Sequence, residues 1–180
     1  LATILRQLKA GSEEHVLRFT YYALLTIFRK ICDAVAFAHS LGILHRDIKP
    51  DNIMVGGFGE VLMMDWGIAK LIGDKEIEPP ENIGAVFTNV ANSEATLSGV
   101  VKGSPAFMSP EQAKGLGDKI NERSDVFLLG STLYNIATLH APYTGSDIQE
   151  TITNAQQGNL ISSALRAPGR NIPRELIRII

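Results

Sequence analysis

Residues 45–52 read His-Arg-Asp-Ile-Lys-Pro-Asp-Asn and form the densest group of chemically capable side chains in the sequence. Lys49 follows Asp47 by two positions, so both side chains lie on one face if the segment is extended, and an ammonium there can pair with a phosphate. Asn52 and the later Asp65 offer the hard oxygen ligands that magnesium binds together with substrate phosphates. This pattern indicates a functional loop rather than a solvated charged turn.

Apolar periodicity on both sides predicts the elements that hold this loop. A long helix is predicted before it and ends near Gly42, because apolar residues recur every three or four positions at Leu24, Ile27, Phe28, Ile31, Val35 and Ala38. Residues 43–44 form a short apolar piece. Residues 53–55 and 61–64 are predicted strands, and the glycines within 56–59 favour a turn between them. The loop therefore leads directly into a hairpin.

The rest of the chain is predicted to be mainly helical. Apolar residues at helical spacing within 1–8 predict a short helix, and residues 148–155 predict another. Periodicity disappears over residues 73–99, which are expected to form a long loop. A central buried helix is expected to begin at Asp125, a good N-cap residue, and Pro173 is expected in the first turn of a last helix.

Four motifs stand in a familiar order. Residues 45–52 match a kinase catalytic loop, His-Arg-Asp-Leu-x-x-x-Asn, with Ile in the Leu position, and Asp65-Trp66-Gly67 follows where Asp-Phe-Gly is usual. Residues 103–111 resemble a peptide-positioning loop that closes with Ala-Pro-Glu, here with Ser109 in place of Ala, and residues 124–130 resemble the start of the central helix. The sequence thus resembles the protein kinase family, above all the eukaryotic-like Ser/Thr kinases of bacteria.

The resemblance implies a protein-kinase-like fold, which is α+β overall. Residues 1–180 would be a partial kinase domain: a mainly α-helical C-terminal lobe with a small antiparallel hairpin at the active site, a catalytic loop at 45–52 and an activation segment at 65–111. The N-terminal lobe is expected to be absent, since no Gly-rich loop, strand Lys or helix Glu that clamps ATP occurs in these residues. These 180 residues alone are expected to be inactive, and their ATP-dependent autophosphorylation would refute that.

The resemblance also assigns roles at the site. Asp47 would orient the substrate hydroxyl and accept its proton, and Lys49 would contact the transferring phosphate. Asn52 and Asp65 would bind magnesium and, through it, ATP. Met54 would lie under the adenine ring, although its spacing alone fits a plain core methionine equally well. The implied cofactors are therefore ATP and Mg²⁺.

Other residues are expected to shape the site. His45 is expected to be a packing and hydrogen-bonding scaffold rather than a base, with Trp66 packed near it. Asp125, besides capping its helix, would hydrogen-bond the backbone of the catalytic loop. By resemblance Ser104 bonds the catalytic Asp and Lys, and both Lys49 and Ser104 point to Ser/Thr rather than Tyr specificity.

Two further residues concern regulation and folding. Glu111 usually pairs in this family with a later Arg beyond these residues. Arg46 precedes Asp47, which is the pattern of kinases whose activation loop is ordered by a phosphate that pairs with this guanidinium. The candidate acceptors are Thr88, Ser93, Thr96 and Ser98. The alternative is an unmodified loop, and mass spectrometry that finds the active kinase unphosphorylated there would exclude the hypothesis.

Composition excludes several classes of partner. Seventeen basic and nineteen acidic residues give a net charge of −2, so nucleic acid is not an expected partner. No uncharged apolar run is long enough for a membrane segment. Cys32 is the single cysteine, which rules out an internal disulfide and favours a cytoplasmic location, or the cytoplasmic side of a membrane if an anchor lies outside these residues.

Three functions are compatible with the motifs. The first is an active Ser/Thr protein kinase that uses ATP and protein substrates, and the intact Asp47, Lys49, Asn52 and Asp65 favour it. The second is a pseudokinase or regulatory docking module without phosphoryl transfer, although such proteins commonly lose one of those residues. The third, a small-molecule kinase of similar fold, is disfavoured by Lys49 and by the peptide-positioning loop.

Overall fold

The computed structural model describes residues 1–67, 69–71 and 104–180. Its elements, in chain order, are α1 (Ala2–Lys9), α2 (Glu13–Arg18), α3 (Tyr21–Ser40), β1 (Ile43–Leu44), a 3-10 turn (Pro50–Asn52), β2 (Ile53–Val55), β3 (Val61–Met63), β4 (Lys70–Leu71), α5 (Pro110–Ala113), α6 (Glu122–Thr138), α7 (Ile148–Gln157), α8 (Ser163–Arg166) and α9 (Arg174–Ile177). The candidate phosphate acceptors Thr88, Ser93, Thr96 and Ser98 lie outside the described residues.

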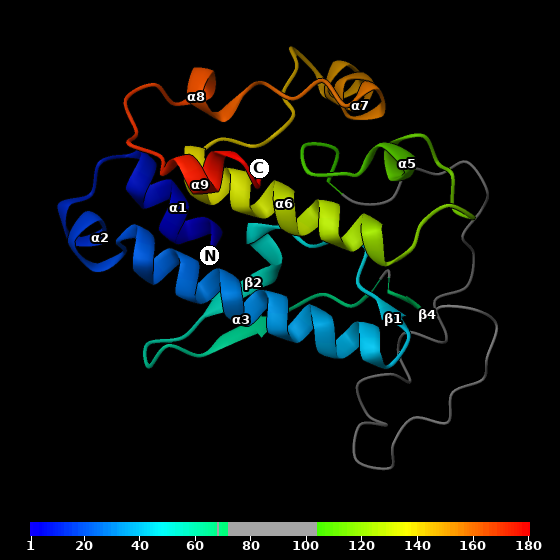
Figure 1. Ribbon diagram of the computed structural model, residues 1–180, viewed down its shortest axis with the longest axis horizontal. Coiled ribbons are helices and arrows are strands. Elements are labelled where there is room, and N and C mark those ends of the chain that lie inside the picture. Colours follow the sequence, from blue (N-terminus) through cyan, green and yellow to red (C-terminus); the bar gives the residue numbers. More distant parts are fainter. Residues whose placement is uncertain (68, 72–103) are drawn as a thin grey trace.

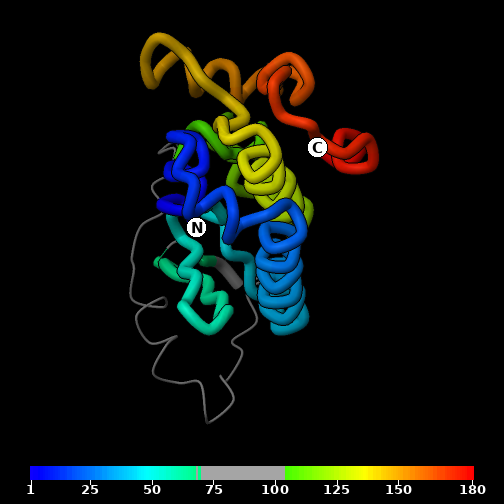
Figure 2. Tube along the Cα trace, turned by 90° about the vertical axis from the view of Figure 1, so that its left-hand side faces the viewer, coloured from blue at the N-terminus to red at the C-terminus, as the bar shows by residue number. Residues whose placement is uncertain are grey.

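Helices α3 and α6 form the centre of the fold and lie side by side in both views (Figures 1 and 2). The hydroxyl of Thr20 caps α3 by accepting from the Ala23 amide. The predicted apolar stripe of α3 faces inward and packs against α1, α6 and the loop; the buried cluster includes Leu5, Leu24, Ile27, Ile31, Val35, Ile48, Ile53, Leu128 and Ile136. Full burial of one such side chain contributes about 1.5–3 kcal/mol. This cluster therefore supplies a rigid base for the loop.

Helix α6 begins earlier than the sequence predicts. Its N-cap is Asn121, whose side chain accepts from the Arg123 amide, while the Ser124 hydroxyl accepts from the Asn121 amide. Asp125 is the fourth residue of the helix and is fully buried. The prediction of Asp125 as N-cap is therefore wrong, because its carboxylate faces the protein interior and a suitable cap already stands four residues before it.

Two short antiparallel sheets flank the catalytic loop. The predicted hairpin is present: β2 pairs with β3 in the register Ile53 to Met63, Met54 to Leu62 and Val55 to Val61. Gly59 has a φ of +87° in the connecting turn, a conformation that glycine adopts without steric cost. Strand β1 pairs instead with β4, which the sequence pattern does not predict. Residues 45–52 thus connect β1, which belongs to one sheet, to β2, which belongs to the other.

The remaining helices differ from prediction in detail. Helices α1 and α7 form where periodicity predicts them, and residues 13–18 form the short helix α2, for which no prediction was made. Pro173 was expected in the first turn of the last helix, but it is the N-cap of α9 and directly precedes the first turn. Among the described residues, no helix combines the length and apolarity that crossing a bilayer requires.

Candidate active site

The first turn of α6 holds the start of the catalytic loop. Asp125 accepts the backbone amide of His45 at 2.8 Å through Oδ2 and that of Arg46 at 2.8 Å through Oδ1. Oδ2 also accepts from Nε2 of His39 in α3 at 2.9 Å. The contact that the family resemblance implies between Asp125 and the loop backbone is therefore present. The buried carboxylate joins two long helices to the residues just before Asp47.

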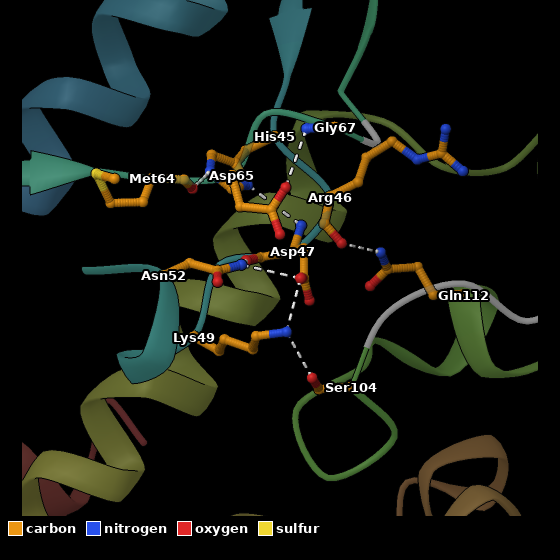
Figure 3. A network of polar contacts seen from close by, with 10 residues as sticks. All are labelled: His45, Arg46, Asp47, Lys49, Asn52, Met64, Asp65, Gly67, Ser104 and Gln112. Atoms are coloured by element: carbon orange, nitrogen blue, oxygen red, sulfur yellow. Dashed lines mark hydrogen bonds and ion pairs between the residues drawn. The ribbon is translucent and has the colours of Figure 1, made fainter. Parts of the chain in front are cut away.

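Side chains also satisfy the next backbone groups of the loop. The Arg46 carbonyl accepts from Nε2 of Gln112 at 2.7 Å, and the Asp47 carbonyl accepts from Nδ2 of Asn52 at 2.8 Å (Figure 3). The Asp47 amide donates to Nδ1 of His45 at 3.3 Å. Arg46 has a φ of +69°, which costs a non-glycine residue about 1–2 kcal/mol. These tertiary bonds hold the loop in a conformation that its local sequence does not favour.

The predicted catalytic pair lies within one polar cluster. Lys49 Nζ is 2.7 Å from Oδ2 of Asp47 and donates to Oγ of Ser104 at 2.7 Å. Asn52 Nδ2 also donates to Oδ2 of Asp47, at 2.9 Å. Ser104 makes the expected bond to Lys49 but reaches Asp47 only through that ammonium. Two donors fix the Asp47 carboxylate, so its other oxygen, Oδ1, is the one that a substrate hydroxyl could approach.

His45 connects the loop to the Asp65-Trp66-Gly67 motif. Its Nδ1 accepts the Asp47 amide, so Nε2 carries the proton and donates to the Met64 carbonyl at 3.2 Å. Its ring lies 4.5 Å from the Trp66 ring, as expected. Burial lowers the pKa of His45, and the nearby carboxylates of Asp125, Asp47 and Asp65 oppose this only in part. Both ring nitrogens hold backbone groups, which fits a scaffold better than a base.

Asp65 lies beside this loop and directly precedes Trp66 in the sequence. Its φ is +57° and its side chain is exposed, with Oδ1 accepting the Gly67 amide at 3.3 Å. The Asn52 amide nitrogen is used by Asp47, so Oδ1 of Asn52 remains as its possible metal ligand. Figure 3 shows Asp65 and Asn52 both adjoining Asp47.

These two oxygen donors fit magnesium, which needs few protein ligands when phosphates supply the rest. No cluster of three or more His, Cys, Asp or Glu suited to a metal occurs within residues 1–67, 69–71 and 104–180.

Met54 is not a core residue. It lies on β2 with 50% of its surface exposed, and its cross-strand partner Leu62 is 55% exposed. The alternative reading of Met54 as plain core is therefore wrong, because this face of the hairpin packs against none of the core clusters that the described residues form. The pair presents an open apolar surface next to Asn52, where a flat apolar ring could bind.

Glu111 ties the peptide-positioning segment to α6. Its Oε1 accepts from the Ser124 hydroxyl at 2.5 Å. Partial burial raises the pKa of Glu111, but hydrogen bonds from the hydroxyls of Ser124 and Ser109 outweigh this, so the pKa lies below its ordinary 4.5. Ser109 and Gln112 form a reciprocal capping box around α5. This short helix is thus locked at both its cap and its first turn.

Two residues of the site were missed from sequence, His39 and Gln112. His39 lies in the last turn of α3 without a distinguishing pattern. The spacing of Ser109 and Gln112 is a recognisable capping box, but it does not reveal that the Gln112 amide also bonds the Arg46 carbonyl. Both residues act across more than sixty positions of sequence.

Comparisons with known proteins agree with this geometry. The protein kinase domain family matches residues 3–179. The Serine/threonine-protein kinase PknD of Protochlamydia amoebophila is 38% identical over 172 residues, which cover 94% of this chain and 17% of that protein. The PknD proteins of Chlamydia muridarum and Chlamydia pneumoniae are 37% and 35% identical, over 87% and 100% of this chain and 17% and 19% of theirs.

The chain spans less than a fifth of the length of these curated relatives. The predicted kinase-like fold and the resemblance to bacterial Ser/Thr kinases are confirmed. This chain belongs to the protein kinase domain family.

Proposed function

We infer that the protein containing this chain transfers the γ-phosphoryl group of ATP to Ser or Thr hydroxyls of protein substrates. One observation carries the proposal: Lys49 and Asn52 both bond Oδ2 of Asp47, and Lys49 also bonds Ser104. A proton acceptor, a cation and the Asn52 amide thus belong to one hydrogen-bonded cluster, and Figure 3 shows Asp65 beside Asp47. Phosphoryl transfer needs this combination, since the protein mainly positions the reactants and offsets charge.

Asp47 is proposed as the catalytic base. Its Oδ1 would accept the hydrogen bond of the substrate hydroxyl and then its proton, while Oδ2 stays fixed by two donors. Lys49 lies next to Asp47, so its ammonium can neutralise charge on the transferring phosphoryl oxygens. When bound, magnesium would offset the charge on the ATP phosphates, and Asn52 and Asp65 are the residues proposed to hold it.

Specificity for Ser and Thr follows from the same cluster. The bond from Lys49 to Ser104 joins the catalytic loop to the segment before α5, which is proposed to position the peptide. The similar proteins named above are themselves Ser/Thr kinases by name. Protein substrates and ATP are therefore the proposed partners. A cytoplasmic setting is also proposed, supported by the single cysteine.

The test is a phosphotransfer assay of the complete protein with Asp47→Asn. Loss of a positioned general base lowers kcat by about 10²–10⁴-fold, whereas ATP affinity is expected to stay nearly constant. Asp51→Asn is the matched control, because Asp51 lies in the same loop but is exposed. An Asp47→Asn protein that phosphorylates Ser/Thr peptides as fast as the wild type would falsify the proposal.

A further inference from the structure

One buried side-chain amide, that of Gln112 in α5, holds a backbone carbonyl of the catalytic loop. Nε2 of Gln112 donates to the Arg46 carbonyl at 2.7 Å, and Gln112 is almost fully buried. That carbonyl belongs to the peptide bond that leads into Asp47. Any displacement of this peptide would turn the Asp47 side chain, so the bond acts directly on the orientation of the proposed base.

Gln112 is also held at its other end. Its side-chain Oε1 accepts the backbone amide of Ser109 at 3.1 Å. Its backbone amide donates to Oγ of Ser109 at 3.5 Å. Because both polar atoms of one planar amide are bonded, the side chain cannot turn without breaking a buried hydrogen bond, and such a loss costs about 1–3 kcal/mol. The side-chain amide of Gln112 therefore forms a rigid hydrogen-bonded link between α5 and Arg46.

The peptide bond between Arg46 and Asp47 is held on both of its sides, because the Asp47 amide donates to Nδ1 of His45 while the Arg46 carbonyl accepts from Gln112. Arg46, with its positive φ, is itself held by two helices: its amide donates to Asp125 in α6, and its carbonyl accepts from Gln112 in α5. Figure 3 draws the second of these contacts. Asp125 alone fixes only the amide side. Gln112 restrains the carbonyl side, next to the Asp47 amide that His45 restrains.

We propose that Gln112 is a positioning residue that sets the orientation of Asp47 through the Arg46 carbonyl, and so couples the peptide-positioning segment to the catalytic base. The inference rests on the proposed function for its effect on rate. Its structural part, the coupling of α5 to the loop, can be tested without any activity.

The test uses the complete protein with Gln112→Glu, assayed at about pH 8, where a carboxyl is ionised. The carboxylate keeps the size and the acceptor for Ser109 but sets an oxygen against the Arg46 carbonyl. Gln112→Met, which lacks the donor at any pH, is the second variant. Gln156→Glu is the matched control, since Gln156 donates a similar bond from α7 to the Ala113 carbonyl in the same short helix.

Hydrogen–deuterium exchange of the 45–52 peptide is expected to accelerate in both Gln112 variants and not in Gln156→Glu, with the α3 peptides unchanged. The kcat for peptide phosphorylation is expected to fall about ten-fold or more, while the stoichiometry and affinity of ATP binding stay within two-fold. A protein that had merely lost its fold would lose ATP-binding stoichiometry as well.

If the 45–52 peptide exchanges at the wild-type rate in both Gln112 variants, the inference is overturned, whatever the activity of these variants. So does faster exchange with kcat unchanged. If the wild type itself transfers no phosphate, the proposed function fails, and the exchange result alone then decides whether Gln112 restrains the loop.

Discussion

The catalytic loop and the β2–β3 hairpin are neighbours in sequence but are held in different ways. The backbone hydrogen bonds of the hairpin are made within residues 53–63, by the pairing of β2 with β3 and by the bond from the Gly56 amide to the Glu60 carbonyl. Residues 45–47 rely on side chains, of which those of Asp125 and Gln112 lie more than sixty positions away. A loop whose backbone is not hydrogen-bonded within a sheet or helix of its own must obtain its geometry from tertiary contacts, so its shape is only as stable as those partners.

The largest expected effect concerns Asp125. Asp125→Ala leaves the His45 and Arg46 amides buried without their acceptor, at about 1–3 kcal/mol each, so chemical denaturation of the kinase domain should show a loss of roughly 2–6 kcal/mol. Glu122→Ala is the control, because Glu122 is an exposed acidic residue in the same first turn. Equal losses in the two variants would contradict the contrast between loop and hairpin.

An intermediate effect is expected from pH. Burial places the pKa of His45 below its ordinary 6.5, so as pH falls below 6.5 the unfolded state binds a proton that the folded state does not, and stability decreases. The stability contributed by keeping His45 neutral is fully present above pH 6.5. It is lost as the pH falls from 6.5 toward the lower pKa of His45 in the folded state.

The measurement is the free energy of unfolding of wild type and His45→Phe between about pH 8 and pH 5. The gap between the two proteins should narrow as pH falls, because Phe carries no proton in either state. A gap that is constant with pH would show that the His45 ring titrates as it does in water.

The smallest effect is expected in the hairpin turn. Phe58 is 99% exposed, so Phe58→Ala should change stability by less than about 0.5 kcal/mol despite the large loss of side-chain volume. Thermal unfolding of this variant beside Asp125→Ala measures the contrast directly. A large loss for Phe58→Ala would mean that this ring is covered by another part of the complete protein.

Much of the fold could be predicted from local pattern. The stripe of α3 and the glycine turn of the hairpin are signals that lie within a few residues, and both elements form where predicted. The start of α6 was missed, because Asn121 and Asp125 are equally good caps locally. The catalytic-loop amides decided between them, since they bind the Asp125 carboxylate. The pairing of β1 with β4 joins Ile43 to Leu71 and Leu44 to Lys70, which lie 28 and 26 positions apart, and leaves no local trace.

The sequence by itself determined which chemical groups the site contains: the residue types of 45–52 and their order identify the groups that are proposed to act on phosphate and magnesium. Only the tertiary structure decided how they are aimed. Arg46 takes a backbone conformation that its own residue type disfavours, and it is kept there by Asp125 on one side and Gln112 on the other. Residue identity is a local property, whereas the direction of a side chain depends on every group that bonds the backbone beneath it.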